Sequence, residues 1–375
     1  MIKIQPPLDR AILVAAPVTR SDDDIHAEQH LEELARLTHT AQAEVVGRMM
    51  QRVKKISPRL LIGRGKLERL GEMVAEREAT LVIFDQELTP VQGKNLEDAL
   101  QARVMDRTEV ILDIFAIRAR TTEARMQVEL AQLQYTLPRL ARMWSHLSRI
   151  RGGIGLRGPG ETQLETDRRL IRQRITRLKT KLEGVAKHRE VVRQGQARRK
   201  VLTGALVGYT NAGKSSLLHA LSGAKVLVED RLFATLDTVA REVFVPPDDR
   251  LRLIDTVGFI RKLPHHLIAS FRATLEEASH ADILFHVIDG SHPDWEEQVR
   301  VVDRVLADLS LDGAMVSHVF NKMDNVADPQ IFAARVRRQY ERAVCVSATR
   351  RELDELKDTF PGLFAERRMA SRVGG

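Results

Sequence analysis

The eight residues from Gly208 to Ser215 have the types and the spacing that bind the phosphates of a nucleotide. The pattern is a glycine, four variable residues and then Gly-Lys-Ser, and it is formed here by Gly208, Tyr209, Thr210, Asn211, Ala212, Gly213, Lys214 and Ser215. Glycines let backbone N–H groups wrap around phosphate oxygens, and a helix that begins at the end of the loop adds a favourable dipole. We expect Lys214 to reach the β- and γ-phosphates and the Ser215 hydroxyl to bind Mg²⁺.

Three shorter motifs follow in the order that a guanine-nucleotide domain requires. They are Asp255, Thr256, Val257 and Gly258, then Asn321, Lys322, Met323 and Asp324, and finally Ser347, Ala348 and Thr349. We expect Asp255 to hold a magnesium-bound water and the Gly258 amide to meet the γ-phosphate. Asp324 can accept hydrogen bonds from guanine N1 and the 2-amino group. Adenine cannot supply these bonds and would leave the acceptor unpaired, so the site is predicted to select GTP. The last motif is expected to close over the base.

A threonine between the first two motifs must complete the magnesium site in the GTP-bound state. The segment Phe233, Ala234, Thr235, Leu236 and Asp237 is expected to contact the nucleotide, and Thr238 follows it directly. Thr235 and Thr238 both have the required hydroxyl, and the residue types alone do not decide between them. The residues expected to act in hydrolysis are Lys214, this threonine and Gly258.

Residues 201–365 contain the elements that must position these motifs. A strand, a loop and a helix recur five times, and the motifs stand at the carboxyl ends of apolar strands such as Gly204–Val207, Leu251–Ile254 and Met315–Phe320. Open α/β sheets bind their ligands at that edge. We therefore predict an α/β GTPase domain with a mostly parallel sheet, followed by a short tail over residues 366–375.

Residues 1–120 are predicted to form a separate, small α/β domain. Apolar strands over Ala11–Ala16, Val45–Met50 and Leu81–Phe84 alternate with helical patterns, which favours a parallel sheet. The stretch Gly63–Lys66 reads Gly-Arg-Gly-Lys before a helix. Because it lacks a following serine or threonine, we interpret it as a structural glycine turn; the alternative is a second nucleotide site that binds ATP.

The middle of the chain, residues 121–200, is predicted to form an antiparallel pair of helices with a glycine-rich tip. Glu123–Ile150 and Thr162–Arg193 carry leucine and isoleucine at three- and four-residue spacing, and Arg151–Gly160 between them is rich in glycine. This part has nineteen lysines and arginines against seven acidic residues, whereas the rest of the chain is net acidic although the total charge is +8. The asymmetry favours nucleic acid as a partner; a solvated helical face is the alternative.

The composition excludes several classes of protein. The longest apolar runs, such as Ala79–Phe84, are too short to span a bilayer, and no basic stretch followed by an apolar run opens the chain. We therefore expect neither membrane insertion nor a signal peptide. Cys345 is the only cysteine, which excludes an internal disulfide and fits a reducing cytoplasm. We expect a cytoplasmic monomer.

Beyond the nucleotide motifs, the sequence resembles the HflX family of ribosome-associated GTPases over nearly the whole chain. The resemblance is carried by Asp106–Thr108, Ile111–Phe115, Gln127–Leu133, Gly152–Arg169 and Asp255–Arg261. It implies that the loop Phe233–Asp237 contributes the magnesium-binding threonine, which favours Thr235. It also implies binding to the large ribosomal subunit, with the helical pair and the N-terminal domain facing ribosomal RNA, and splitting of stalled ribosomes in stressed cells.

Two departures from the family pattern bear on this expectation. Thr238-Val239 stands where members usually have Pro-Thr, and many members carry a further small C-terminal domain after the position of Gly375. A ribosome contact made through that domain would be missing, whereas GTP binding would be unaffected. At the glycine-rich tip, we expect Arg151 and Arg157 to contact ribosomal RNA.

Three functions remain open on the sequence. The first is a GTPase switch that acts on the ribosome in splitting, rescue, recycling or biogenesis. The second is an RNA-binding hibernation or assembly factor with slow hydrolysis, and the third is a nucleotide-driven RNA remodeller. Phe259 stands where many GTPases have a glutamine that orients the attacking water, so we expect slow intrinsic hydrolysis and stimulation by ribosomes. Asn211 is typical of GTPases that bind K⁺ beside the phosphates; alternatively, it only braces the loop.

Overall fold

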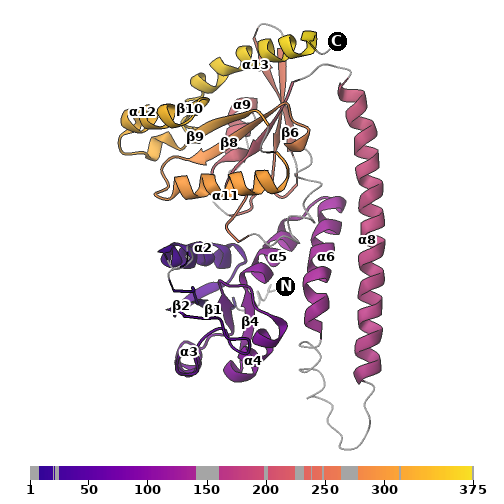
Figure 1. The fold of residues 1–375 in the computed structure, drawn as a ribbon, viewed down its shortest axis with the longest axis vertical. Helices are drawn as coiled ribbons and strands as arrows, with labels where there is room; N and C mark the ends of the chain where they lie inside the picture. Colours follow the sequence, from indigo (N-terminus) through magenta and orange to yellow (C-terminus); the bar gives the residue numbers. More distant parts are fainter. Residues whose placement is uncertain are drawn as a thin grey trace, which may run out of the picture. The chain divides into compact units, whose positions relative to one another are not determined.

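The chain folds into two compact units in the computed structural model (Figure 1). One consists of Met1–Ile117 and Arg125–Lys181, and the other of Arg118–Ala124 and Leu182–Gly375. The structure describes residues 8–19, 21, 25–140, 160–197, 202–223, 232–237, 239–246, 249–262, 278–311 and 314–373. The short segment Arg118–Ala124 packs with the second unit although its neighbours in sequence belong to the first. The domain boundaries at 120 and 200 follow motifs rather than packing and stay a prediction.

The first unit is built on a four-stranded parallel sheet in the order β2-β1-β3-β4. Its elements are β1 (Arg10–Ala15), α2 (Ala27–Thr40), β2 (Glu44–Met50), α3 (Arg64–Glu76), β3 (Leu81–Phe84), α4 (Pro90–Leu100), β4 (Arg103–Asp106) and α5 (Arg107–Arg118). The two central strands, β1 and β3, are almost wholly buried, as a parallel sheet covered on both faces requires. The predicted α/β fold of this part is confirmed.

Hydrogen bonds of Gly63 and Thr89 precede two helices of the first unit. Gly63 precedes α3, and its amide donates a hydrogen bond to the Gln51 Oε1 at 3.0 Å. Thr89 precedes α4, and its hydroxyl accepts a hydrogen bond from the Gln92 amide at 3.2 Å, while the Gln92 side chain accepts one from the Thr89 amide at 2.9 Å. This capping box satisfies backbone donors that the helix itself leaves unpaired.

The middle of the chain forms the predicted antiparallel helical pair, α6 (Thr122–Thr136) and α8 (Gly160–Ala197), with a 3₁₀ turn (Leu137–Arg139) after α6. Glu129 pairs with Arg174 at 2.6 Å, and Glu123 pairs with Arg189. Glu123, the earlier residue of α6, thus pairs with Arg189, the later residue of α8, so the two helices run in opposite directions. Residues 141–159, which include the end of the first predicted helix and Arg151 and Arg157 of the predicted glycine-rich tip, lie outside the described residues.

The second unit is built on a six-stranded sheet in the order β10-β9-β8-β5-β7-β6. Its elements are β5 (Leu202–Val207), α9 (Lys214–Ser222), β6 (Val239–Val245), β7 (Asp249–Asp255), β8 (Ile283–Asp289), α11 (Trp295–Asp308), β9 (Val316–Asn321), a 3₁₀ turn (Met323–Asn325), α12 (Pro329–Gln339), β10 (Ala343–Cys345) and α13 (Asp354–Val373). The mostly parallel sheet is confirmed, with β6 antiparallel to β7. The fivefold strand–loop–helix alternation is therefore wrong at this edge. Only residues 246–248 join β6 to β7, and they are too few for the helical crossover between parallel strands.

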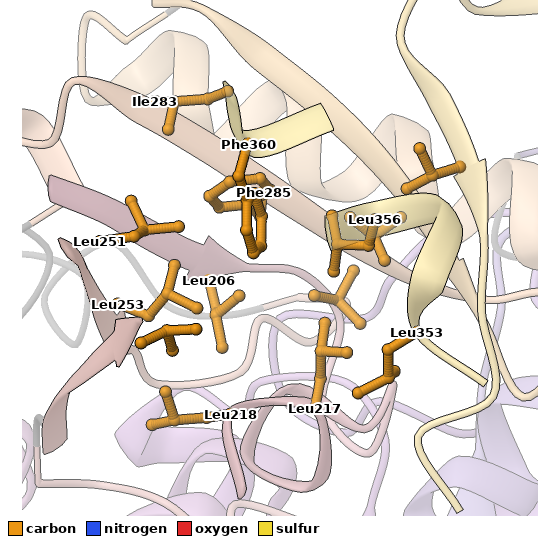
Figure 2. Packing of buried hydrophobic residues seen from close by; sticks show 14 of the residues in the cluster. Leu206, Leu217, Leu218, Leu251, Leu253, Ile283, Phe285, Leu353, Leu356 and Phe360 are labelled. Carbon is orange, nitrogen blue, oxygen red and sulfur yellow. The ribbon is translucent and has the colours of Figure 1, made fainter. Parts of the chain in front are cut away.

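Aliphatic and phenylalanine side chains fill the core of the second unit (Figure 2). Leu206, Leu253 and Phe285 from the sheet belong to one buried cluster with Leu217 of α9, and Phe360 of α13 packs edge-on against Phe285 with ring centroids 6.1 Å apart. This packing fixes the carboxyl ends of the strands, where the predicted motifs stand. No helix within the described ranges is long and apolar enough to cross a membrane.

Candidate nucleotide site

The phosphate loop, Gly208–Ser215, connects β5 to α9 through two glycines that no other residue can replace without strain. Gly208 has a φ of +147°, and a Cβ there would lie 2.2 Å from the carbonyl oxygen of Val287. Gly213 has a φ of +93°, and a Cβ there would lie 2.2 Å from the Asn321 Nδ2. The backbone of the loop therefore keeps its close approach to β8 and β9 only with glycine at both positions.

Lys214 is the first residue of α9, and its side chain is buried within the loop. The Nζ donates hydrogen bonds to the carbonyl oxygens of Gly208 at 3.1 Å and Tyr209 at 2.8 Å. Burial lowers the pKa of Lys214 to about 8, and the nearby Asp255 carboxylate opposes this effect. Negative charge placed beside this ammonium group would stabilise its protonated form. The loop thus holds a cation that a phosphate can neutralise.

Three oxygen-bearing side chains meet at the start of α9. The Ser215 Oγ lies 2.6 Å from the Thr235 Oγ1 and 2.6 Å from the Asp255 Oδ2. The Asp255 Oδ1 is buried and has no hydrogen-bond partner among the residues that the structure describes. Burial raises the pKa of Asp255, and the hydrogen bond from Ser215 opposes this most strongly. Oxygen ligands of this kind are those that Mg²⁺ prefers, so the residues fit the predicted ion. The alternative residue, Thr238, lies outside the described residues.

The segment after Asp255 is bonded directly to the phosphate loop. The Phe259 amide donates to the Gly208 carbonyl oxygen at 3.0 Å, and the Phe259 carbonyl oxygen accepts from the Thr210 amide at 2.7 Å. A Cβ at Gly258 would lie 2.7 Å from the Thr210 Cα and 3.0 Å from the Lys214 Nζ, so this position requires glycine. The Phe259 side chain is only 2% exposed and is part of the core.

The two loops predicted to bind the base are tied to the phosphate loop by Asn321. Its Nδ2 donates to the Ala212 carbonyl oxygen at 3.0 Å, and its Oδ1 accepts from the Ala348 amide at 3.0 Å. The Ser347 hydroxyl donates to the Asp324 Oδ1 at 2.6 Å. The structure therefore brings together three motifs that are far apart in sequence, and Ser347 orients the carboxylate that is expected to read guanine.

The other residues of these motifs differ in their surroundings. Lys322 pairs with Asp289 at 2.7 Å, Met323 is buried, and Thr349 is exposed. Thr256 and Val257 are buried beside β7. These residues shape the loops, whereas Asp324 carries the group that can discriminate between bases.

A cavity of about 280 Å³ lies along the phosphate loop and the segment around Thr235. The predicted residues that line it are Thr210, Asn211, Gly213, Lys214, Ser215, Phe233, Ala234, Thr235, Leu236, Asp237, Thr256 and Gly258. Arg118 and Arg120 also line this cavity, and sequence reasoning missed them. They precede the helical pair, far from any nucleotide motif, and their positive charge is the only signal that the sequence offers.

Comparison with known proteins agrees with this arrangement. Three family models match successive parts of the chain: GTP-binding GTPase N-terminal over residues 28–116, GTP-binding GTPase Middle Region over 118–196, and 50S ribosome-binding GTPase over 203–322. A crystal structure described as the complex of SsGBP and GDP covers 96% of this chain and 99% of its own, with a TM-score of 0.54 and 24% identity. At that identity the likeness supports the fold alone.

Three curated relatives, each named GTPase HflX, match most of the chain. The protein from Caldanaerobacter subterraneus subsp. tengcongensis is 52% identical over 84% of this chain and 73% of its own length. The one from Lacrimispora saccharolytica is 48% identical over 95% and 83%, and the one from Escherichia coli 44% identical over 89% and 76%.

The fold and the site define a phosphate-loop GTPase, an enzyme that binds GTP and hydrolyses it to GDP and phosphate. With these identities over most of its length, the chain belongs to the HflX family of GTPases. The resemblance found in the sequence is confirmed.

Proposed function

We propose that this GTPase holds Mg²⁺ with Ser215, Thr235 and, through water, Asp255, and that it acts on the large ribosomal subunit. The observation that supports the metal site is the meeting of these three side chains, with two oxygen–oxygen distances of 2.6 Å. Two hydroxyl ligands leave the other positions around Mg²⁺ to phosphate oxygens and water, as this ion usually requires. Bound there, Mg²⁺ would neutralise charge on the phosphates.

The residues of the chain itself then supply binding and charge stabilisation. Lys214 places its ammonium group against the β- and γ-phosphates, and the backbone amides of the loop surround them. The Gly258 amide donates to the γ-phosphate, because no side chain there separates backbone from nucleotide. Thr235 is expected to bind Mg²⁺ only when the γ-phosphate is present, so that this ligand distinguishes the GTP-bound state from the GDP-bound state.

Hydrolysis without a partner is expected to be slow. The Phe259 side chain lies in the core and has neither a donor nor an acceptor with which to orient water. Asn211 lines the cavity and offers a candidate position for K⁺ beside the phosphates. Replacing Na⁺ by K⁺ should then raise the rate of phosphate release at saturating GTP, whereas equal rates in the two salts would remove Asn211 from this role.

The ribosomal part of the proposal rests on charge and on the matched family description. Residues 121–200 carry the basic excess of the chain, and the GTPase domain matches the family model of 50S ribosome-binding GTPases over residues 203–322. Lys and Arg side chains bind RNA chiefly through its phosphates. We propose that the helical pair contacts ribosomal RNA, with Arg151 and Arg157 at its tip, and that the chain works as a cytoplasmic monomer in ribosome splitting, rescue, recycling or biogenesis.

Sedimentation with separated ribosomal subunits tests this proposal. With a nonhydrolysable GTP analogue the chain should pellet with the large subunit, and with GDP it should pellet less. Binding should weaken steeply with salt, because phosphate contacts release counterions. Replacing Arg151 and Arg157 by glutamine should reduce binding without changing GTP affinity.

The matched control replaces Arg304 and Arg338, two exposed arginines on α11 and α12 of the GTPase domain, by glutamine. It removes the same charge at a different place and should bind normally. Pelleting with the small subunit alone, or equal loss in both double variants, would contradict the proposal.

A further inference from the structure

Asp237 ends the segment that carries Thr235, and its carboxylate is bonded to residues 116 and 117 positions earlier in the chain. The Oδ2 accepts hydrogen bonds from the Arg120 amide at 3.1 Å and the Thr121 amide at 3.3 Å, and the Oδ1 accepts one from the Thr121 hydroxyl at 2.5 Å. All of these residues belong to the second unit. Hydrogen bonds to a carboxylate are about twice as strong as neutral ones, so this is a firm attachment.

Thr121 has a second role at the start of helix α6. Its hydroxyl oxygen accepts a hydrogen bond from the Ala124 amide at 3.1 Å, which caps the helix, while the hydroxyl hydrogen is donated to Asp237. A hydroxyl can make both bonds because it is donor and acceptor at once. The positive end of the helix dipole also favours a carboxylate at this place.

These contacts fix the segment Phe233–Asp237 at both ends. At its beginning, the Phe233 amide donates to the Thr210 hydroxyl of the phosphate loop at 2.9 Å. At its end, Asp237 is held by Thr121. Thr235 lies between these two attachments, with its hydroxyl 2.6 Å from the Ser215 Oγ. Its position therefore depends on a residue that begins the helical pair.

The attachment extends from α6 to α8. Glu123, in the first turn of α6, pairs with Arg189 of α8 within the same unit. The bond from the Arg120 amide to Asp237 also holds Arg120 at the wall of the nucleotide cavity, which Arg118 lines as well. A continuous set of polar contacts thus joins the nucleotide cavity to both helices of the basic pair.

We propose that Asp237 and Thr121 are positioning residues for GTP hydrolysis, which hold Thr235 at the magnesium site and couple that site to the helical pair. The proposal rests on the proposed role of Thr235. Because coupling between sites is reciprocal, a ligand that fixes the start of α6 also fixes Thr235, and bound GTP in turn fixes the start of α6. This provides a route by which a partner of the helical pair changes the rate of hydrolysis.

A double-mutant cycle on the full chain tests the pair. Thr121→Val and Asp237→Ala should each lower kcat by about tenfold or more, while GDP affinity stays within about twofold, because the loss falls on the GTP-specific position of Thr235. The double variant should be no slower than the slower single variant, since both changes break the same contact. Thr121→Ser keeps the hydroxyl and should restore the rate.

Thr89→Val is the matched control, because it removes the capping hydroxyl of α4 in the first unit, away from the nucleotide cavity. It should leave kcat unchanged. Normal rates in both single variants, or losses that add in the double variant, would overturn the proposal. Thr235→Ala distinguishes failure of the positioning role from failure of the proposed magnesium site. If Thr235→Ala loses hydrolysis while the Thr121 and Asp237 variants do not, only the positioning role fails. If Thr235→Ala hydrolyses normally, the proposed magnesium site fails as well.

Discussion

The two units place polar residues at the carboxyl ends of parallel strands, but they satisfy these residues in opposite ways. In the first unit, Asp85 follows β3, and its carboxylate is paired with Arg107 at 3.0 Å, close to His30 at 3.9 Å. Arg107 also pairs with Glu33. Asp85 and Arg107 are almost completely buried, and their charges are neutralised by other charges of the protein itself.

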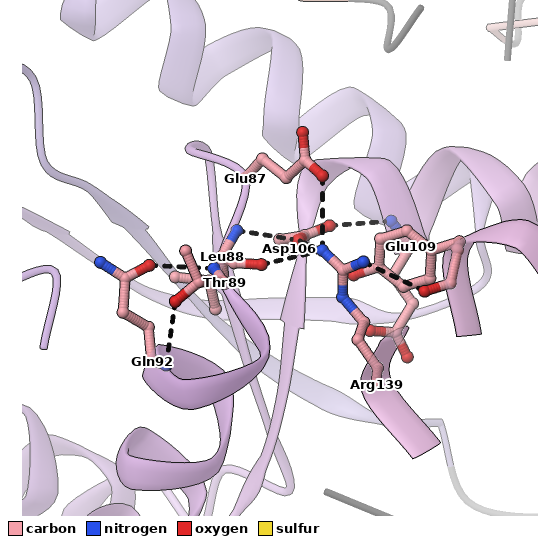
Figure 3. Close-up of polar contacts among 8 residues, drawn as sticks. Glu87, Leu88, Thr89, Gln92, Asp106, Glu109 and Arg139 are labelled. Carbon is pink, nitrogen blue, oxygen red and sulfur yellow. Dashed lines mark hydrogen bonds and ion pairs between the residues drawn. The ribbon is translucent and has the colours of Figure 1, made fainter. Parts of the chain in front are cut away.

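A second network at the end of β4 follows the same rule (Figure 3). The Asp106 carboxylate accepts hydrogen bonds from the amides of Leu88 and Glu109, both at 3.0 Å. Arg139 donates to the Leu88 carbonyl oxygen at 2.8 Å and to Glu87 at 3.3 Å. Burial raises the pKa of Asp106, and the hydrogen bond from the Leu88 amide opposes this most strongly.

The strand ends of the second unit are arranged for another molecule. Asp255 ends β7, and its buried Oδ1 has no hydrogen-bond partner among the described residues. The Lys214 Nζ donates hydrogen bonds to two carbonyl oxygens of its own loop, those of Gly208 and Tyr209. Glycines at 208 and 213 bring backbone close without side chains. A parallel sheet provides a place for a ligand at the carboxyl ends of its strands, and the residues at those ends decide whether a ligand binds there.

The largest effect is expected from a substitution in the buried charge network of Asp85, Arg107 and Glu33 in the first unit. Arg107→Ala leaves Asp85 buried without its main partner and should lower the free energy of unfolding by about 3–5 kcal/mol. GTP affinity should stay the same, because the change lies in the other unit. The control Arg48→Ala removes an exposed pair with Glu32 and should cost less than about 1 kcal/mol. Denaturant unfolding measures both; equal losses would contradict the distinction.

A smaller effect is expected on the side of the ligand. Asp324→Asn should weaken GTP binding by at least about 2 kcal/mol, because the amide no longer offers the paired acceptor that guanine requires. Calorimetric titration with GTP and with ATP measures the change, and the ratio of GTP affinity to ATP affinity should decrease. Unchanged GTP affinity would remove the loop Asn321–Asp324 from base recognition.

The smallest expected effect is the pH dependence of GTP affinity that arises from the Lys214 ammonium group. Without nucleotide, the pKa of Lys214 is about 8, below its ordinary value of 10.5, and the phosphates of GTP should raise it again. Above pH 8 the free enzyme has lost a proton that the complex keeps, so binding should take up a proton and affinity should fall as pH rises, by at most about tenfold per pH unit. Titrations at pH 7 and pH 9 in buffers with different ionisation enthalpies measure the uptake. No uptake at pH 9 would show that Lys214 stays charged without nucleotide.

The sequence predicts the parts of the fold in which local chemistry and structure agree. The phosphate loop is defined by its glycines and lysine, and the strand Leu81–Phe84 by a continuous apolar run. The antiparallel edge strand β6 escaped prediction because most of its side chains are exposed, so it lacks the continuous apolar run that marks the buried parallel strands. Strand β4 escaped because it is only four residues long and includes Arg103 and Asp106.

The contacts of Asp237 were beyond sequence reasoning for a different reason. The sequence places Asp237 two residues after the expected magnesium ligand and predicts contact with the nucleotide, but its partners lie 116 and 117 positions away. Neither the residue types of Arg120 and Thr121 nor their spacing predicts a contact with Asp237. Only the packed structure brings a helix start and a nucleotide loop together.

The rate of GTP hydrolysis by Thr235 variants at saturating Mg²⁺ tests the proposed magnesium site directly. Phosphate release should fall on the order of a hundredfold in Thr235→Ala, while GDP affinity is unchanged and Thr235→Ser keeps most of the activity, because the serine retains the hydroxyl. Thr238→Ala should hydrolyse GTP normally. Normal hydrolysis in Thr235→Ala together with a loss in Thr238→Ala would contradict the magnesium site formed by Ser215, Thr235 and Asp255.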